Sequence, residues 1–133
     1  MIEGYKYETA PLTEYERETL LPIFVKCLQR KIGREKAISN KMMCYKLEEN
    51  GYKVSETRVR KLINHIRLNN LISCLVASGN GYYVADNPKD IKEHIRSLKG
   101  RVAAILAVIE ALQEQAGLGD YDCYLDDEQP TVQ

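Results

Sequence analysis

The stretch that decides the fold is ISNKMMCYKLEENGYKVSETRVRKLINHIRLNNLISCLVASGNGYYVAD, residues 38–86. It contains two helix starts in close succession. Ser39 and Ser55 are favourable N-cap residues, because a serine hydroxyl accepts a hydrogen bond from a backbone N–H of the first helical turn. Gly51 lies between them and is typical of a helix that ends in a left-handed residue. The spacing predicts two helices, over residues 40–50 and 56–69.

The hydrophobic period changes after the second of these helices. LISCLVAS, residues 71–78, predicts a strand, and GYYVAD, residues 81–86, predicts a returning strand. The Ser-Gly-Asn-Gly sequence between them is typical of a tight turn. A two-stranded hairpin of this length is marginal alone, so we expect it to pack against the helices.

A further helix is predicted before this stretch. Thr13 and Glu16 have the spacing of a capping box, so the helix starts there. It continues through LLPIFVKCLQRK, where Pro22 should kink it or divide it into two pieces. Gly33 is the expected end. Residues 1–12 show no period and are predicted to form an irregular arm.

A long final helix is predicted over residues 88–116, starting at Asn87-Pro88. Its apolar residues alternate in steps of four and three, which is the heptad pattern of a coiled coil. The residues that follow it, 117–133, are acidic and have the composition of a disordered tail. The heptad positions are Ile91, Ile95, Leu98, Val102, Ile105, Ile109 and Leu112.

Charge is distributed unevenly along the chain although the formal net charge is zero. Residues 17–101 hold 18 of the 19 lysines and arginines but only 8 of the 19 acidic residues. Both ends of the chain are therefore acidic. A basic block of this kind is the electrostatic pattern expected for a protein that binds a polyanion, and a Lys-rich solvated surface is the alternative.

Helix, short turn, helix and hairpin in this order resemble the winged helix-turn-helix family of DNA-binding domains, with the match covering residues 13–86. The resemblance implies a mainly α (α+β) fold of three helices and a two-stranded β-hairpin wing, followed by the long coiled-coil-like helix. It also implies sequence-specific binding of double-stranded DNA. The final helix is similar to dimerisation helices of small phage, plasmid and bacterial regulators, so the expected role is transcription regulation or phage and mobile-element replication and maintenance.

The helix over residues 56–69 is the expected reader of the major groove. Its buried stripe should be Val59, Leu62, Ile63 and Ile66, at helical spacing. The opposite face is polar, and ordinary solvated residues are the alternative interpretation of it. The resemblance suggests base contacts from Thr57, Arg58, Lys61 and Asn64, and phosphate contacts from Arg60 and Arg67.

Four further positions are predicted to touch the DNA backbone. A helix N-terminus binds phosphate well, which favours Ser39 and Lys41, although Ser39 can equally be a cap alone. Lys46 and Lys53 extend this positive charge. The hairpin tip has no lysine or arginine, so only Asn80 or backbone amides can reach phosphate there.

The apolar surface of the final helix predicts self-association, because exposed apolar patches of that size are rare on soluble monomers. We expect a homodimer or a small bundle formed through the heptad residues. The alternative function is a protein-interaction adaptor, in which the winged-helix scaffold and this helix bind another protein and the basic face is incidental.

No enzyme is expected, because neither histidine is spaced for a catalytic pair and no phosphate-binding glycine motif occurs. No cofactor and no metal site are expected, since the four cysteines lack zinc spacing. The sequence has no apolar run long enough to cross a membrane, and its first residues lack the pattern of a signal peptide, so we expect neither a membrane span nor a signal peptide. Scattered single cysteines favour a reducing, cytoplasmic location.

Overall fold

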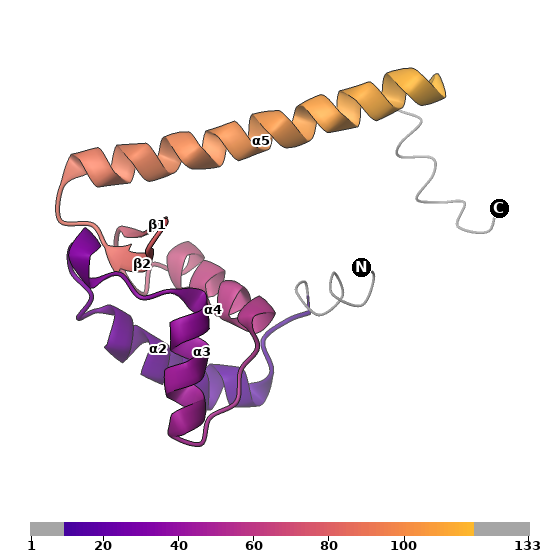
Figure 1. Cartoon of the computed structure of the whole chain (residues 1–133). Coiled ribbons are helices and arrows are strands. Elements are labelled where there is room, and N and C mark those ends of the chain that lie inside the picture. The colour runs from indigo at the N-terminus through magenta and orange to yellow at the C-terminus, as the bar shows by residue number, and fades with distance from the viewer. Residues whose placement is uncertain (1–9, 119–133) are drawn as a thin grey trace. The chain divides into compact units, whose positions relative to one another are not determined.

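A computed structural model describes residues 10–118 and shows a mainly helical protein with a small antiparallel hairpin and a long C-terminal helix (Figure 1). The predicted acidic tail, apart from Gly117 and Leu118, and most of the predicted N-terminal arm lie outside the described residues. The elements in chain order are η1 (Glu16–Leu20), α2 (Leu21–Leu28), η2 (Arg34–Lys36), α3 (Asn40–Glu49), α4 (Glu56–Leu68), β1 (Leu75–Ser78), β2 (Gly81–Val84) and α5 (Pro88–Ala116).

The first helix begins with the predicted capping box. The Thr13 amide donates to Glu16 Oε1 over 2.9 Å, and the Glu16 amide donates to Thr13 Oγ1 over 3.1 Å. As predicted, the helical run around Pro22 consists of two pieces. The π-helical segment η1 ends at Leu20, and the α-helix α2 has Pro22 in its first turn and continues to Leu28. Proline lacks an N–H group, so the regular hydrogen-bond ladder is interrupted at this point, and a π segment accommodates the interruption.

Both predicted serine caps are confirmed. Ser39 Oγ accepts from the Met42 amide over 3.1 Å, and Ser55 Oγ accepts from the Arg58 amide over 3.2 Å. Helix α3 ends at Glu49, and Gly51 follows its C-cap with a left-handed φ of 86°, which suits a residue without a Cβ atom. The turn between α3 and α4 is therefore fixed by local chemistry at both of its ends.

The core lies where α2, α3 and α4 meet, and its central residues come from α4. The predicted stripe on α4 is confirmed, because all four of its apolar side chains are at most 1% exposed. Burying a side chain of this size contributes roughly 1.5–3 kcal/mol, so this stripe holds the helices together. The buried core residues of η1 and these three helices are Leu20, Phe24, Leu28, Met43, Leu47, Val59, Leu62, Ile63 and Ile66.

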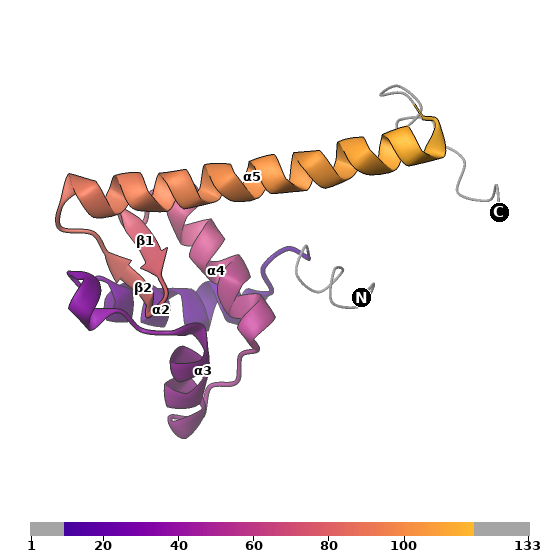
Figure 2. The same cartoon turned by 45° about the horizontal axis from the view of Figure 1, so that its top comes forward.

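The hairpin pairs β1 with β2, with Val76 opposite Tyr83 and Ser78 opposite Gly81 (Figure 2). Its outer edge is covered by the segment that precedes α3, since Ile38 and Tyr82 exchange backbone hydrogen bonds of 2.8 and 2.9 Å. Only the second half of the predicted strand over residues 71–78 is a strand, namely β1 (Leu75–Ser78). Residues 71–74 form a bend followed by a turn instead.

Polar contacts join the start of α5 to β2 and η2. Asn87 is the predicted cap, accepting from the Asp90 amide over 2.9 Å. The Asp90 carboxylate accepts from Tyr83 Oη over 3.0 Å and from Arg34 over 3.1 Å. The bond from Arg34, together with that from Tyr83, holds the pKa of Asp90 below its usual range. Arg34 also pairs with Glu93 at 2.8 Å.

The described residues fall into two compact units that divide within α5, one ending at His94 and the other beginning at Ile95. The first two turns of α5 therefore belong to the first unit. From Ile95 to Ala116 the helix carries its heptad side chains exposed, between 41% and 60% for those at the predicted positions.

The helix α5 contains one glycine, Gly100, in its interior. A Cβ atom at this position would meet nothing within 4 Å. Glycine destabilises a helix interior by about 0.5–1 kcal/mol relative to alanine. We therefore expect Gly100→Ala to raise α5 helicity and thermal stability, measured by circular dichroism during heating. A lower helicity would contradict a continuous exposed helix at this point.

Candidate nucleic-acid interface

The exposed surface of α4 is a polar strip opposite its buried stripe. Asn64 and Arg60 are exposed, whereas Thr57 and Lys61 are half-buried along the same side of the helix. Helical geometry places Thr57 and Asn64 in one row, because seven residues are close to two turns. Arg60 and Lys61 lie on either side of that row. Four of the six predicted DNA-contacting residues of α4 thus share one solvent-facing surface, which we call the α4 strip: Thr57, Arg60, Lys61 and Asn64.

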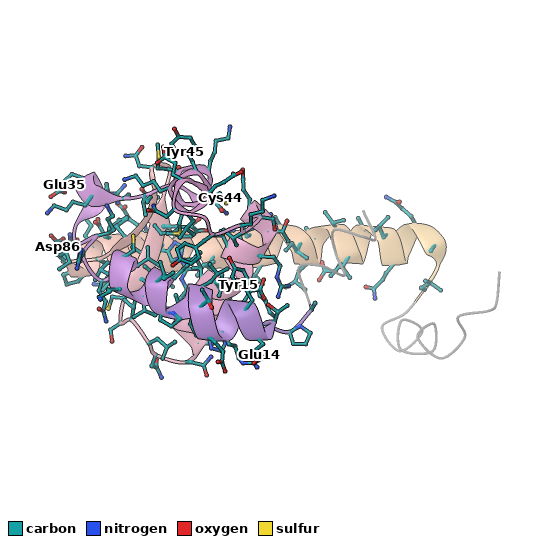
Figure 3. All side chains as sticks on the ribbon, turned by 90° about the horizontal axis from the view of Figure 1, so that it is seen from below. Glu14, Tyr15, Glu35, Cys44, Tyr45 and Asp86 are labelled. Atoms are coloured by element: carbon teal, nitrogen blue, oxygen red, sulfur yellow. The ribbon has the colours of Figure 1, made fainter. Side chains whose placement is uncertain are left out.

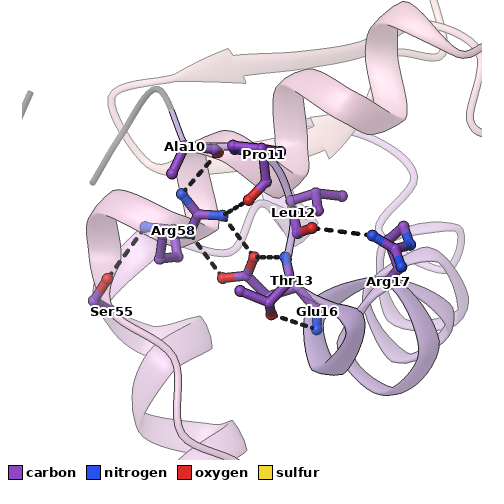
Figure 4. A network of polar contacts seen from close by, with 8 residues as sticks. All are labelled: Ala10, Pro11, Leu12, Thr13, Glu16, Arg17, Ser55 and Arg58. Atoms are coloured by element: carbon purple, nitrogen blue, oxygen red, sulfur yellow. Dashed lines mark hydrogen bonds and ion pairs between the residues drawn. The ribbon is translucent and has the colours of Figure 1, made fainter. Parts of the chain in front are cut away.

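Arg58 is not part of the α4 strip, and its prediction as a base-contacting residue is wrong. Its side chain is 2% exposed and lies against the first helix (Figure 4). Nε donates to Glu16 Oε2 over 2.7 Å, and Nη2 donates to Glu16 Oε1 over 2.6 Å. The guanidinium also donates to the carbonyls of Ala10 and Pro11, over 3.1 and 2.9 Å. A side chain enclosed in this way cannot reach a groove.

Electrostatics explain why this buried pair is ionised. Hydrogen bonds from Arg58, and next the backbone N–H of Thr13, lower the pKa of Glu16, although burial alone would raise it. Glu16 therefore has two structural tasks, since the same carboxylate completes the capping box. We call the group of Glu16, Arg58 and the two carbonyls the Arg58 clamp.

Arg67 occupies the other edge of α4, where it fastens the helix to the hairpin. Its Nε donates to the Leu75 carbonyl over 2.9 Å, and its guanidinium carbon lies 5.9 Å from the Tyr82 ring centroid. Burial raises the pKa of Tyr82, while the charges of Arg67 and Arg60 act in the opposite direction. The half-buried Arg67 is thus primarily a structural residue, and its predicted phosphate contact is not supported by this position.

The start of α3 lies beside the start of α4. Asn40 Nδ2 donates to the Glu56 carbonyl over 3.3 Å, which joins the first turns of the two helices. Ser39 is exposed, and its hydroxyl is engaged as the cap. Lys41 is exposed two residues later. The predicted phosphate-binding end of α3 therefore lies next to α4 with Lys41 available at its surface.

Lys46 is exposed on the side of α3 that borders α2. It lines a small apolar pocket between α2 and α3, beside Ile23 and Cys27. Five residues separate it from Lys41, which is about 140° around an α-helix. Tyr45 projects outward from α3 and is 58% exposed (Figure 3). Lys41 and Lys46, which were both predicted to touch the DNA backbone, therefore lie on two different sides of α3.

The remaining two predicted contacts are peripheral. Lys53 is exposed in the turn before α4, near Glu48, and its backbone carbonyl accepts from Tyr15 Oη over 3.2 Å. Asn80 is exposed at the hairpin tip, where its amide donates to Ser78 Oγ over 3.1 Å. The hydrogen bonds that Lys53 and Asn80 make within residues 10–118 therefore go to Tyr15 and Ser78, and not to the α4 strip.

Residues 10–118 contain no group of three or more His, Cys, Asp or Glu side chains that could hold a metal ion. Within the same residues, no helix combines the length and apolar character needed to cross a membrane.

The chain matches no protein-family model, and no curated protein or solved structure shows a significant match to it.

Proposed function

We propose that this chain binds double-stranded DNA through the α4 strip, as a winged-helix protein in which the β1–β2 hairpin is the wing. The observation that carries the proposal is the exposed row on α4, in which Asn64 lies between Arg60 and Lys61 and no acidic residue follows Glu56. Asparagine bonds adenine bidentately in the major groove, and arginine and lysine bond phosphate or guanine. The helix is long enough, at 13 residues, to lie along a groove.

The surrounding contacts support a rigid presentation of that row. The Arg58 clamp fixes one edge of α4 to the first helix, and Arg67 fixes the other edge to the hairpin. A helix held on both sides loses little conformational freedom when it binds, which favours affinity. Asn64 and Lys61 are assigned to base edges, and Arg60 and Lys41 to phosphates.

Binding should be tested by fluorescence anisotropy with duplex DNA at several salt concentrations. We expect Arg60→Ala to weaken binding by about tenfold, because a charge-assisted hydrogen bond contributes about 1.5 kcal/mol. Loss of a phosphate contact should also reduce the salt slope by about one. Asn64→Ala should instead reduce discrimination between sequences, by about 1–3 kcal/mol at the base pair it contacts.

Lys46→Ala is the matched control, because it removes the same charge from the side of α3 that faces α2. Its affinity should stay close to that of the unaltered protein. The proposal fails if no binding is detected at low salt, or if Lys46→Ala weakens binding as much as Arg60→Ala does.

The exposed apolar side chains of α5 favour one other candidate, a protein-interaction adaptor. In that case the α4 strip would be incidental, and duplex affinity would be absent at every salt concentration. The same anisotropy experiment therefore separates the two functions.

A further inference from the structure

The second unit of the chain begins at Ile95 and is the rest of α5. Within the described residues, nothing covers the apolar side of this helix. Its heptad side chains from Ile95 to Leu112 are each at least 41% exposed. Soluble proteins avoid a contiguous apolar surface of this extent unless something covers it. The question is which occupant the sequence of α5 fits.

We infer that the occupant is α5 of a second copy, lying antiparallel to the first. In an antiparallel pair of helices, each residue at heptad position a packs against a residue at position d of the partner. One alignment of the two helices gives this pairing along the whole exposed segment. It places Ile95 opposite the partner's Leu112, Leu98 opposite its Ile109, and Val102 opposite its Ile105. By the two-fold symmetry of the pair, each of these layers occurs twice.

The charges of α5 favour this direction. Its positive charges in the exposed segment all lie in the first half, at Arg96, Lys99 and Arg101, and its negative charges lie later, at Glu110 and Glu114. In the antiparallel register Glu110 lies level with the partner's Ser97, within reach of its Lys99. A parallel pair would instead place the three basic residues of both copies at one level, where like charges repel.

The same register accounts for two additional exposed apolar residues, Leu106 and Val108. They flank the heptad positions rather than occupy them. In the antiparallel pair Leu106 lies beside the partner's Lys99, and Val108 lies beside its Arg101. Long basic side chains cover apolar surface with their methylene groups while the charge stays in water, so the flanks are covered as well as the centre.

The first test is the mass of the full chain in solution, measured by sedimentation over a dilution series. Two chains of 15.2 kDa each are expected at high concentration. Ile105→Glu, in the central layer, should shift the mass to that of one chain. Ala107→Glu adds the same charge on the opposite side of the helix and should leave the mass at two chains. A single-chain mass for the unaltered protein, a four-chain mass, or no effect of Ile105→Glu would overturn the pair.

The second test is direction, by disulfide formation between two variants in a background without the native cysteines. One chain carries Leu98→Cys and the other carries Ile109→Cys, with a tag to distinguish their masses. The antiparallel pair forms the mixed disulfide when the two are combined. In a parallel pair, disulfides form only between two copies of the same variant. Residues 98 and 109 are then about 16 Å apart along the axis, which is too far for the mixed disulfide. That result would overturn the inference. No DNA is used, so the outcome is independent of the proposed function.

Discussion

Arg58→Ala is expected to lower the free energy of unfolding by about 3–5 kcal/mol, because removing one partner leaves the other charge buried and unpaired. Glu16 would keep its buried position with no guanidinium beside it. The carbonyls of Ala10 and Pro11 would lose their donors at the same time. Urea denaturation followed by circular dichroism measures the change.

The matched control is Arg60→Ala, two residues further along the same helix. Arg60 is exposed, so its replacement should change stability by no more than about 0.5 kcal/mol. Arg58→Lys should recover little of the loss, since an ammonium group cannot donate to both carboxylate oxygens in the planar geometry of a guanidinium. Equal stability of Arg58→Ala and Arg60→Ala would contradict the buried clamp.

The clamp also has a pH dependence with a defined sign. The pKa of Glu16 is lowered in the folded protein from its usual value of 4.5. Its contribution to stability is therefore complete above pH 4.5 and is lost as the pH falls through the lowered value. Arg58→Ala should lack this part of the acid sensitivity, so the stability difference between the two proteins narrows in acid.

Gly81→Ala is expected to cost about 2–4 kcal/mol, from backbone strain and a steric clash together. Gly81 has a φ of 125°, which residues with a Cβ atom rarely adopt. A Cβ atom here would lie 2.3 Å from the carbonyl carbon and oxygen of Ile38 and 2.6 Å from the Ser39 nitrogen. Those atoms cannot move aside easily, because two backbone hydrogen bonds join Ile38 to Tyr82. Thermal unfolding measures the loss.

Gly79→Ala, at the tip of the same hairpin, provides the comparison. A Cβ atom at Gly79 would meet nothing within 4 Å, and its φ is not in the left-handed range. Its replacement should therefore stay within about 0.5 kcal/mol of the unaltered protein. If both alanine variants were equally stable, the close approach of β2 to the start of α3 would be wrong.

Features that depend on neighbouring residues could be predicted from the sequence. The caps at Ser39, Ser55 and Asn87 involve partners three residues away, so their signals are local and the structure confirms all three. The stripe on α4 and the extent of α5 follow from periodicity, and both are confirmed. The α4 strip follows from the same period, as the surface opposite the stripe.

Features that depend on distant residues could not be predicted in this way. Arg58 has its partner 42 residues earlier in the chain, and on α4 it lies at the border between the polar and apolar sides. No local pattern distinguishes it from Lys61. Likewise, the side of α3 that carries Lys46 borders α2, and this packing of α2 on α3 cannot be derived from the local pattern of α3.

The predicted strand over residues 71–78 failed for a different reason. Asn70 adopts a left-handed φ of 57°, and the Leu71 amide donates back to the Ile66 carbonyl over 3.0 Å. This closure of the helix end uses the residues that the apolar run assigned to the strand. Cys74, with a φ of 62°, then delays β1 until Leu75.

The Arg58 clamp sets a limit on shortened versions of the protein. A recombinant fragment that started at Thr13 would keep every described helix and strand but would lack the carbonyls of Ala10 and Pro11. Such a fragment would look complete by its secondary structure and still leave part of the guanidinium without acceptors. Expression plasmids for crystallisation or NMR should therefore retain the chain through Ala10, and an affinity tag is best joined ahead of that residue.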